Sequence, residues 1–168
     1  TVINSDTSRH QTITVRNEDN SIRSMEKTTL AANKIERETW VDLNQNGVFA
    51  STDVIDKVVY DSVTGMKTQT LWDRNTNGSV NSITTLETNA SGLTTTTKFD
   101  ADNDGDTDTK TTDVTTLAGN GSATRTVTLN NGDGSLRGST TTVYGADGRT
   151  ITTTTDIDGD SDSDSKMV

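Results

Sequence analysis

The chain alternates β-branched or apolar residues with polar residues over short stretches that are bounded by glycine, asparagine and aspartate. The alternation is clearest in segments 12–15, 66–72, 93–99, 126–129 and 150–155. Threonine, valine and isoleucine suit a pleated, half-buried surface, and period-two alternation between turn residues predicts strands joined by short connections. We therefore expect an all-β chain.

Turn residues recur at intervals of about 13–14 positions, and they centre on Asn20, Asn33, Gly47, Gly65, Gly78, Gly92, Gly105, Gly121, Gly134, Gly148 and Gly159. About eleven turns imply about twelve strands, which short connections arrange as neighbours in sequence order. The predicted fold is a tandem-repeat antiparallel β-meander, an elongated or solenoid-like stack of hairpins. Segments 24–32 and 35–41 contain helix-favouring residues, but their place in the repeat assigns them to strands.

The turns fall into sets of four, which indicates an internal repeat. The first turns of successive sets, at Asn20, Gly78 and Gly134, lie 58 and then 56 residues apart. Segments 12–29 and 125–142 also match in their Asp, Ser, aliphatic and Arg positions. We predict one repeat-built domain, 1–168, with repeat 1 at about 10–66, repeat 2 at about 67–123 and a partial repeat 3 at about 124–168. The two ends suggest a segment of a longer chain, with no leader sequence at its start.

The composition provides little material for a hydrophobic core. Hydrophobic residues make up 27% of the chain and aromatic residues 4%, whereas Thr and Asp, with 36 and 20 copies, supply a third of it. Burying an aliphatic side chain contributes about 1.5–3 kcal/mol, and ordering each residue costs about 1–2 kcal/mol of backbone entropy. The chain therefore needs a further source of stability. Its net charge of −10 favours cations as partners and argues against nucleic acid.

The third turn of the first repeat is acidic and has the spacing of a calcium-binding loop. Segment 42–53 fits D-x-[DN]-x-[DN]-G-x5-[DE], with Asp in place of Glu at the last position. Side chains at alternate positions direct oxygen atoms to one centre, glycine at the sixth position allows the sharp turn, and the seventh residue offers its carbonyl. The candidate ligands are Asp42, Asn44, Asn46, Val48 and Asp53.

The matching turns of the other repeats are more acidic. In the second repeat the candidate ligands are Asp100, Asp102, Asp104, Asp106 and Asp108, with Gly105 at the sixth position. In the third repeat, five aspartates from position 156 to position 164 flank Gly159, and the candidates are Asp156, Asp158, Asp160 and Asp162. Aligning Gly159 with Gly105 puts the first ligand position on Thr154, so this third site is expected to be degenerate or truncated.

A weaker candidate opens the second repeat, with Asp73, Asn75 and Asn77 before Gly78 and no acid at the twelfth position. Here a plain hairpin turn is an equal alternative, because Asp, Asn and Gly favour turns.

Among metals, Ca²⁺ takes six to eight oxygen ligands in flexible geometry, whereas Mg²⁺ demands compact octahedral geometry. Zn²⁺ prefers His and Cys, and the chain has one His and no Cys. The predicted cofactor is therefore Ca²⁺.

The run DADNDGDTD, the segment 146–160 and the alternating turns resemble the tandem repeats of large secreted bacterial calcium-binding proteins, the RTX-type adhesins and related surface proteins. The RTX nonapeptide GGxGxDxUx itself is not present. Segment 100–108 is similar to the calcium loops of FG-GAP and VCBS β-propellers, and segment 42–53 to dockerin loops. Three four-stranded blades are too few to close a propeller. The resemblance implies an extracellular, calcium-stabilised spacer or adhesive module.

Other side chains suggest two alternative functions. Trp72 or Tyr144 could stack against a sugar, which would make the chain a calcium-dependent binding module for a cell-surface glycan or protein. Pairs of threonines at alternate positions, such as Thr126 and Thr128, resemble the ice-binding face of β-solenoid antifreeze proteins, although the pairs are irregularly spaced in sequence. No Ser/His/Asp set, phosphate loop or paired catalytic carboxylate is found, so an enzyme is not expected.

Together these observations predict a calcium-stabilised structural or adhesive repeat module of a secreted bacterial surface protein, which folds and becomes rigid on binding Ca²⁺. The expected partners are calcium ions, neighbouring repeats of the parent chain and a cell-surface glycan or protein. Neither nucleic acid binding nor membrane insertion is expected, because the chain is acidic and has no long apolar run. The expected location is extracellular, at the bacterial surface.

Overall fold

The structure, a computed structural model, describes residues 1–168 as a chain of strands with a single 3-10 turn, η1 (Ser51–Asp53). The strands are β1 (Val2–Ile3), β2 (Arg9–Arg16), β3 (Ile22–Leu30), β4 (Arg37–Val41), β5 (Val54–Tyr60), β6 (Lys67–Arg74), β7 (Val80–Thr88), β8 (Thr94–Asp100), β9 (Thr109–Leu117), β10 (Ala123–Asn131), β11 (Leu136–Tyr144), β12 (Ile151–Asp156) and β13 (Ser165–Met167).

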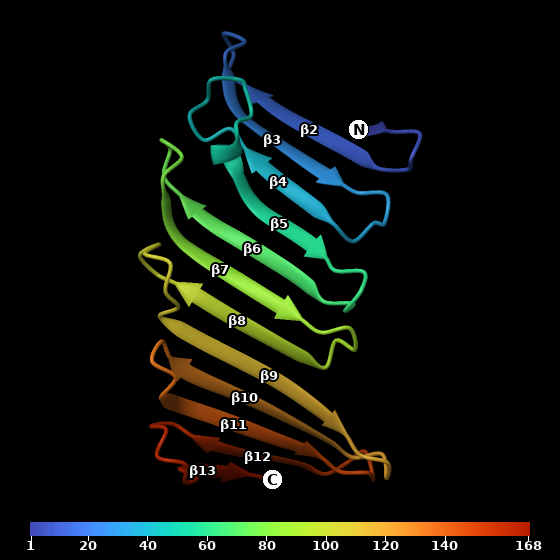
Figure 1. Ribbon diagram of the computed structural model, residues 1–168, viewed down its shortest axis with the longest axis vertical. Coiled ribbons are helices and arrows are strands. Elements are labelled where there is room, and N and C mark those ends of the chain that lie inside the picture. Colours follow the sequence, from blue (N-terminus) through green and yellow to red (C-terminus); the bar gives the residue numbers. More distant parts are fainter.

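All thirteen strands form one sheet in sequence order, and every neighbouring pair is antiparallel (Figure 1). The predicted all-β antiparallel meander is thereby confirmed. Segments 24–32 and 35–41, which contain helix-favouring residues, lie mainly on β3 and β4 as expected. The sheet is open, with β1 and β13 at its two edges, so four-stranded propeller blades are not formed.

The predicted turns lie where the backbone enters the left-handed region. Nine glycines, from Gly47 to Gly159, and Asn20 have positive φ angles, as tight turns require. In the connection between β3 and β4 the left-handed residue is Lys34, with φ of 59°, and not its neighbour Asn33. The side chain of Asn33 instead accepts hydrogen bonds from the backbone N–H groups of Ile35 and Glu36. The turn at Thr7, between β1 and β2, was not predicted.

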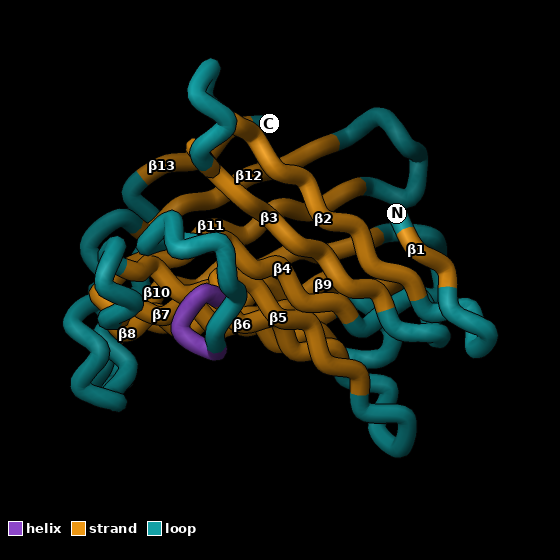
Figure 2. The backbone as a smooth tube through the Cα atoms, turned by 90° about the horizontal axis from the view of Figure 1, so that it is seen from above, coloured by secondary structure: helices purple, strands orange, loops and turns teal.

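The sheet is a single layer without a conventional core (Figure 2). Val58 is the one buried large apolar residue, and the other buried side chains are those of Asp42, Asp53 and Asp156. The accessible surface is 10473 Å². A globular monomer of 18.0 kDa would expose about 8,000 Å². The stability of this sheet therefore depends on its backbone ladder and on its loops more than on apolar burial.

The loops that follow even-numbered strands all lie on the same side of the sheet, at the ends of the strands, on the left in Figure 1. On this side three short turns, 17–21, 75–79 and 131–135, alternate with three long acidic loops, 42–53, 100–108 and 156–164. One short turn and one acidic loop recur every four strands. The repeat seen in the sequence thus corresponds to four strands of the sheet, and it places all the acidic loops on the same side of the molecule.

Candidate metal centre

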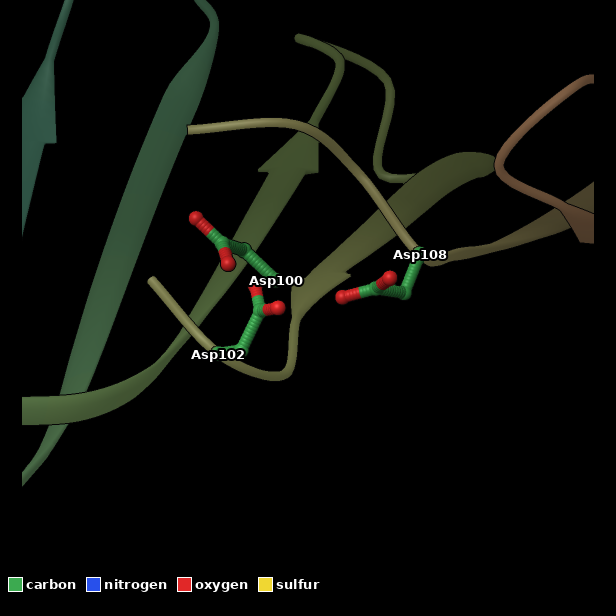
Figure 3. Close-up of side chains that lie close together, drawn as sticks. All are labelled: Asp100, Asp102 and Asp108. Atoms are coloured by element: carbon green, nitrogen blue, oxygen red, sulfur yellow. The ribbon is translucent and has the colours of Figure 1, made fainter. Parts of the chain in front are cut away.

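The Asp100 loop brings three carboxylates together where β8 ends and β9 begins (Figure 3). Oxygen atoms of Asp100, Asp102 and Asp108 lie within 4.8 Å of one another. This arrangement is a typical geometry for holding a hard cation, because three negative charges at such distances repel one another unless a positive charge lies between them. Asp104 and Asp106, which were also predicted as ligands, are not part of this triad.

The backbone of the loop holds Asp100 and Asp108 in place. The Oδ2 atom of Asp100 accepts a hydrogen bond from Gly105 N at 3.1 Å, and the Oδ2 atom of Asp108 accepts one from Ala101 N at 2.6 Å. The Oδ1 atom of Asp100 is buried and has no hydrogen-bond partner. A buried carboxylate oxygen without a partner is costly, and a bound cation would satisfy it.

The Asp156 loop repeats this geometry 56 residues later. Oxygen atoms of Asp156, Asp158 and Asp164 lie within 4.8 Å of one another. Asp156 Oδ2 accepts a hydrogen bond from Ser161 N at 3.2 Å, and Asp164 Oδ2 accepts one from Ile157 N at 2.6 Å. These contacts are equivalent to those of Asp100 and Asp108. The third acidic loop therefore forms the same triad as the second.

This equivalence corrects the sequence alignment of the third loop. Gly159, with φ of 80°, takes the place of Asn103, with φ of 60°, and Ser161, with φ of 76°, takes the place of Gly105. Aligning the two glycines was wrong, because non-glycine residues fill one left-handed position in each loop. The first ligand position is Asp156 and not Thr154, so the loop is neither truncated nor degenerate. Asp164, which the ligand set omitted, joins the cluster, while Asp160 and Asp162 remain outside it.

The Asp42 loop begins with the same contact as the Asp100 loop, but its last acid comes three residues later. Asp42 Oδ2 accepts a hydrogen bond from Gly47 N at 2.8 Å, as Asp100 does from Gly105. Asp53 accepts hydrogen bonds from Ala50 N at 2.7 Å and Leu43 N at 3.4 Å. Asp42 and Asp53 are only 3% and 1% exposed. Two buried carboxylates thus lie at the two ends of this loop, at the positions predicted for the first and twelfth ligands.

The remaining predicted ligands of this loop take part in its turns. Asn44 Oδ1 accepts a hydrogen bond from Asn46 N at 3.1 Å, and Asn46 Oδ1 accepts one from Val48 N at 2.8 Å. The same pattern occurs in the Asp100 loop, where the side chains of Asp102 and Asp104 accept from backbone N–H groups two residues ahead. These contacts curl the backbone so that alternate side chains lie on the inside of the loop.

The fourth candidate, at Asp73, is arranged differently. Asp73 lies on β6, and Asn75 and Asn77 belong to the short turn 75–79. Asn77 Oδ1 accepts a hydrogen bond from Ser79 N at 2.9 Å, and the Asn75 amide donates to Ser79 Oγ at 2.8 Å. Turns 17–21 and 131–135 close with the same backbone hydrogen bonds. Here the structure shows a hairpin turn, and Asp73 belongs to no cluster of three acids.

Neighbouring carboxylates affect the protonation of the Asp156 loop. The charge of Asp160, with further contributions from Asp164 and Asp158, raises the pKa of Asp162 above its usual value. The shift reflects repulsion among the neighbouring carboxylates of the loop. A cation bound at the triad would reverse this effect by favouring the charged carboxylates.

Each of the first two acidic loops packs against the short turn that comes next on the same side of the sheet. A Cβ atom at Gly78 would lie 2.7 Å from Thr52 Cβ, and one at Gly132 would clash with Thr107 O. The Arg74 side chain adds a further link, because it donates to Val54 O at 2.9 Å and to Gly78 O at 2.8 Å. The conformation of an acidic loop is thus coupled to the next hairpin.

The Asp42 loop also contacts one face of the sheet through an aromatic cluster. Lys27 Nζ lies 4.0 Å from the ring centroid of Trp40 and 5.1 Å from that of Phe49, which belongs to the loop. Trp40 precedes Asp42 by two residues, and its Nε1 atom is buried without a hydrogen-bond partner. Trp40 therefore lies where it can report on the conformation of this loop.

No family model, curated protein or solved structure matches the chain. No helix of the chain has the length and hydropathy required to cross a membrane.

Proposed function

We propose that the chain is a calcium-stabilised structural or adhesive repeat module of a secreted bacterial surface protein. In this proposal Ca²⁺ binds the acidic loops, joins the ends of consecutive strands and makes the sheet rigid. The low free calcium of a cytoplasm leaves the chain loosely folded, and the higher calcium outside the cell completes its folding. Its mechanical role is to extend or stiffen an adhesin.

The observation that carries the proposal is the Asp100 triad, in which three carboxylates lie close together and the Oδ1 atom of Asp100 is buried without a hydrogen-bond partner. The same triad recurs at Asp156, in a single-layered sheet whose one buried large apolar residue is Val58. Recurrence at the four-strand spacing supports a structural role, since an active site is rarely duplicated along one domain. The ligand set consists of oxygen atoms alone, which favours Ca²⁺ over Zn²⁺.

Far-ultraviolet circular dichroism in chelator, followed by a Ca²⁺ titration with a Mg²⁺ control, tests the proposal. We expect the β signal of the loosely folded chain in chelator to be weak, and to increase strongly with Ca²⁺ and not with Mg²⁺. The double variant D100N/D156N should lose this response, while D106N/D162N, which removes the same charge outside the triads, should keep it. A β spectrum in chelator that Ca²⁺ leaves unchanged would reduce the acidic loops to ordinary turns.

A second candidate function, ice binding, rests on the alignment of threonines across strands. The pairing places Thr94, Val114, Thr126, Thr141 and Thr154 in one rank on one face of β8–β12, and Thr96, Thr112, Thr128, Ser139 and Asp156 in the next. Asp156, at the end of the second rank, is the one charged side chain among them. Ranks lie about 6.7 Å apart along a strand, and strands about 4.8 Å apart, so the face carries a regular grid of hydroxyl and methyl groups.

This second candidate predicts thermal hysteresis, the gap between the melting and freezing temperatures of ice in the protein solution. Thr126→Lys should abolish the hysteresis, because a charged side chain interrupts the grid. Thr140→Lys, on the opposite face of the same strands, is the matched control and should retain it. Absence of hysteresis in the unmodified, calcium-loaded chain would exclude this function.

A further inference from the structure

The chain contains four Asn-Gly steps, which begin at Asn46, Asn77, Asn120 and Asn131. In such a step the backbone nitrogen of the glycine can attack the side-chain amide carbon of the asparagine, because glycine has no side chain to obstruct ring closure. The attack requires a glycine N–H group that no hydrogen bond occupies. The structure separates the four steps by this requirement.

Three of the four glycine N–H groups already donate hydrogen bonds. Their acceptors are Asp42 Oδ2 for Gly47, at 2.8 Å, Asn75 O for Gly78, at 2.8 Å, and Ala118 O for Gly121, at 3.0 Å. The side chains of the asparagines before these glycines are held as well, because each Oδ1 atom accepts a hydrogen bond from the backbone N–H two residues ahead. Ring closure at these steps therefore has to break two hydrogen bonds first.

The step at Asn131 is arranged differently. Asn131 is the first residue of its turn, since its backbone oxygen accepts from Gly134 N at 2.9 Å. The N–H of Gly132 takes part in no hydrogen bond, and both Asn131 and Gly132 are exposed to water. One contact holds the side chain, from Nδ2 to Ser135 Oγ at 2.9 Å. The attacking nitrogen is therefore free only at this step.

The two matched short turns show that this geometry meets a glycine once. Turns 17–21 and 75–79 also begin with an asparagine whose Nδ2 atom donates to the serine four residues ahead, at 2.9 Å and 2.8 Å. In these turns the next residue is Glu18 or Thr76, whose side chain obstructs ring closure. Among the three short turns, 131–135 alone combines the free nitrogen with glycine.

Two lysines add positive charge beside this step. Lys98 and Lys110 lie directly opposite each other on β8 and β9, and they line a polar hollow of about 360 Å³ together with the Asn131-Gly132 step. Lys98 pairs with Glu87 at 3.0 Å, whereas Lys110 forms no ion pair. The acid of the hollow, Asp133, accepts hydrogen bonds within its own turn. Positive charge favours the anionic nitrogen and the oxyanion that form during the attack.

We propose that Asn131 is a modification site, at which the fold directs spontaneous deamidation. Gly132 N gives its proton to hydroxide and bonds to Asn131 Cγ, the Cγ–Nδ2 bond breaks, and Nδ2 takes up a proton from water and leaves as ammonia. Water then opens the resulting succinimide at one of its two carbonyls. The product is aspartate or isoaspartate at position 131, with one more negative charge at neutral pH.

The isoaspartate product alters the contact between this turn and the Asp100 loop. Gly132 packs so closely on the loop that a Cβ atom there would clash with Thr107 O, and Thr107 directly precedes Asp108 of the triad. Isoaspartate leads the backbone through its own side chain and so adds one atom to the turn. This inference goes beyond the proposed function, because it concerns a covalent change and requires no bound cation.

Peptide mapping by mass spectrometry tests the proposal. The full chain is incubated in calcium at mildly alkaline pH in heavy-oxygen water, whose isotope marks the sites that convert during the incubation. We expect Asn131 to convert about fivefold or more faster than the other three Asn-Gly steps, which must first open their hydrogen bonds. Asn75, which has the same serine contact but precedes Thr76, should remain intact. In urea the four Asn-Gly steps should convert at similar rates.

Equal rates at the four steps of the folded chain would overturn the proposal, as would faster conversion at another step. A lead of Asn131 that persists in urea would also overturn it, because local sequence and not the fold would then be the cause. Lys110→Gln should slow conversion about twofold through loss of charge, and Lys67→Gln, on β6, should not. Equal rates in these two variants would remove the role assigned to Lys110.

Ion-exchange chromatography separates the modified chain by its added charge. The isoaspartate form should unfold at a lower urea concentration than the unmodified chain, and equal midpoints would contradict the effect on the loop contact. The folding test of the proposed function observes the response to Ca²⁺, and this test observes a covalent change at position 131, so the two can fail separately.

Discussion

The carboxylate of Asp164 accepts a hydrogen bond from the backbone N–H of Ile157 at 2.6 Å, which closes the third acidic loop on its own first turn. Asp108 closes the second loop on Ala101 at the same distance. In both loops the closing acid also belongs to the three-carboxylate cluster. The same side chain thus shapes the loop and contributes charge to the candidate metal centre.

Loss of a triad acid should weaken cation binding far more than loss of a neighbouring acid. We expect Asp164→Asn to reduce calcium affinity at its loop by about tenfold or more, since loss of an outer-shell partner alone typically costs 10–100-fold. Asp162→Asn removes the same charge from outside the triad and should have a smaller effect. Isothermal titration calorimetry measures both. Equal losses in the two variants would indicate a diffuse charge effect without a defined site.

The fluorescence of Trp40 should show whether a cation is bound at the Asp42 loop. Lys27 Nζ contacts the rings of both Trp40 and the loop residue Phe49, so ordering of the loop by a cation would change the surroundings of the indole. In a Trp72→Phe background, we expect the fluorescence of Trp40 to change during a calcium titration. Asp53→Asn in that background should remove the change at the same calcium concentrations. An unchanged spectrum at saturating calcium would contradict binding at this loop.

Gly132 should be far less tolerant of a side chain than Gly119. A Cβ at Gly132 would clash with the backbone oxygen of Thr107, whereas a Cβ at Gly119 would meet nothing within 4 Å. Gly132→Ala forces the Asp100 loop and the following turn apart, and we expect it to destabilise the sheet by about 1–3 kcal/mol. Gly119→Ala should change the free energy of unfolding little. Urea denaturation in calcium compares the two variants, and similar unfolding midpoints would argue against packing between the loops.

Acid should destabilise the sheet through its turns. Hydrogen bonds from the backbone N–H groups of Thr150 and Arg149, and then from the Thr150 hydroxyl, lower the pKa of Asp147 to about 2 from its usual 3.8. A depressed pKa contributes stability above the unfolded value, and this contribution is lost as the pH falls through the folded value. Hydrogen bonds to Ser8, Ser21 and Ser135 lower the pKa of Asp6, Asp19 and Asp133 in the same way.

We therefore expect the Tm measured in chelator to fall as the pH is lowered from about 4 to about 2. Asp147→Ala should lower the Tm at neutral pH and flatten its dependence on pH within this window. A variant whose acid dependence matches that of the unmodified chain would rule out a contribution from Asp147.

Asp162 should behave in the opposite sense. Its pKa is raised by the charge of Asp160 and its neighbours, so the ionised group destabilises the folded loop at neutral pH, and this penalty disappears as the pH falls through the raised value. Asp162→Asn should therefore raise the Tm at pH 7 in chelator. The gain should vanish in acid, and also in calcium, where a bound cation offsets the repulsion. Differential scanning calorimetry under the three conditions tests this, and a gain that persists in acid would point to another cause.

Local features of the sequence were sufficient to predict the strands and most of the turns. β-branched alternation and left-handed glycines act within a few residues, so segments such as 93–99 and the turn at Gly105 follow from sequence alone. The acidic loops could likewise be identified from the sequence, because the alternate spacing of Asp42, Asn44 and Asn46 is the spacing that a cation-binding loop requires. The turn at Lys34 was displaced by one residue, since the side chain of Asn33 binds the backbone instead.

Only the tertiary structure decided how distant residues meet. Asp164 closes the third loop because its position is fixed by Thr155 and Ile157 across the base of the hairpin, and alignment of glycines could not show this. The ranks of threonines likewise depend on cross-strand register, which loop lengths disguise in the sequence. The local sequence pattern also could not predict whether the sheet closes, because alternation defines the two faces of a strand and does not define its neighbours. The structure decides this point: the thirteen strands pair in sequence order in one open sheet, because each short connection places the next strand beside the one before it.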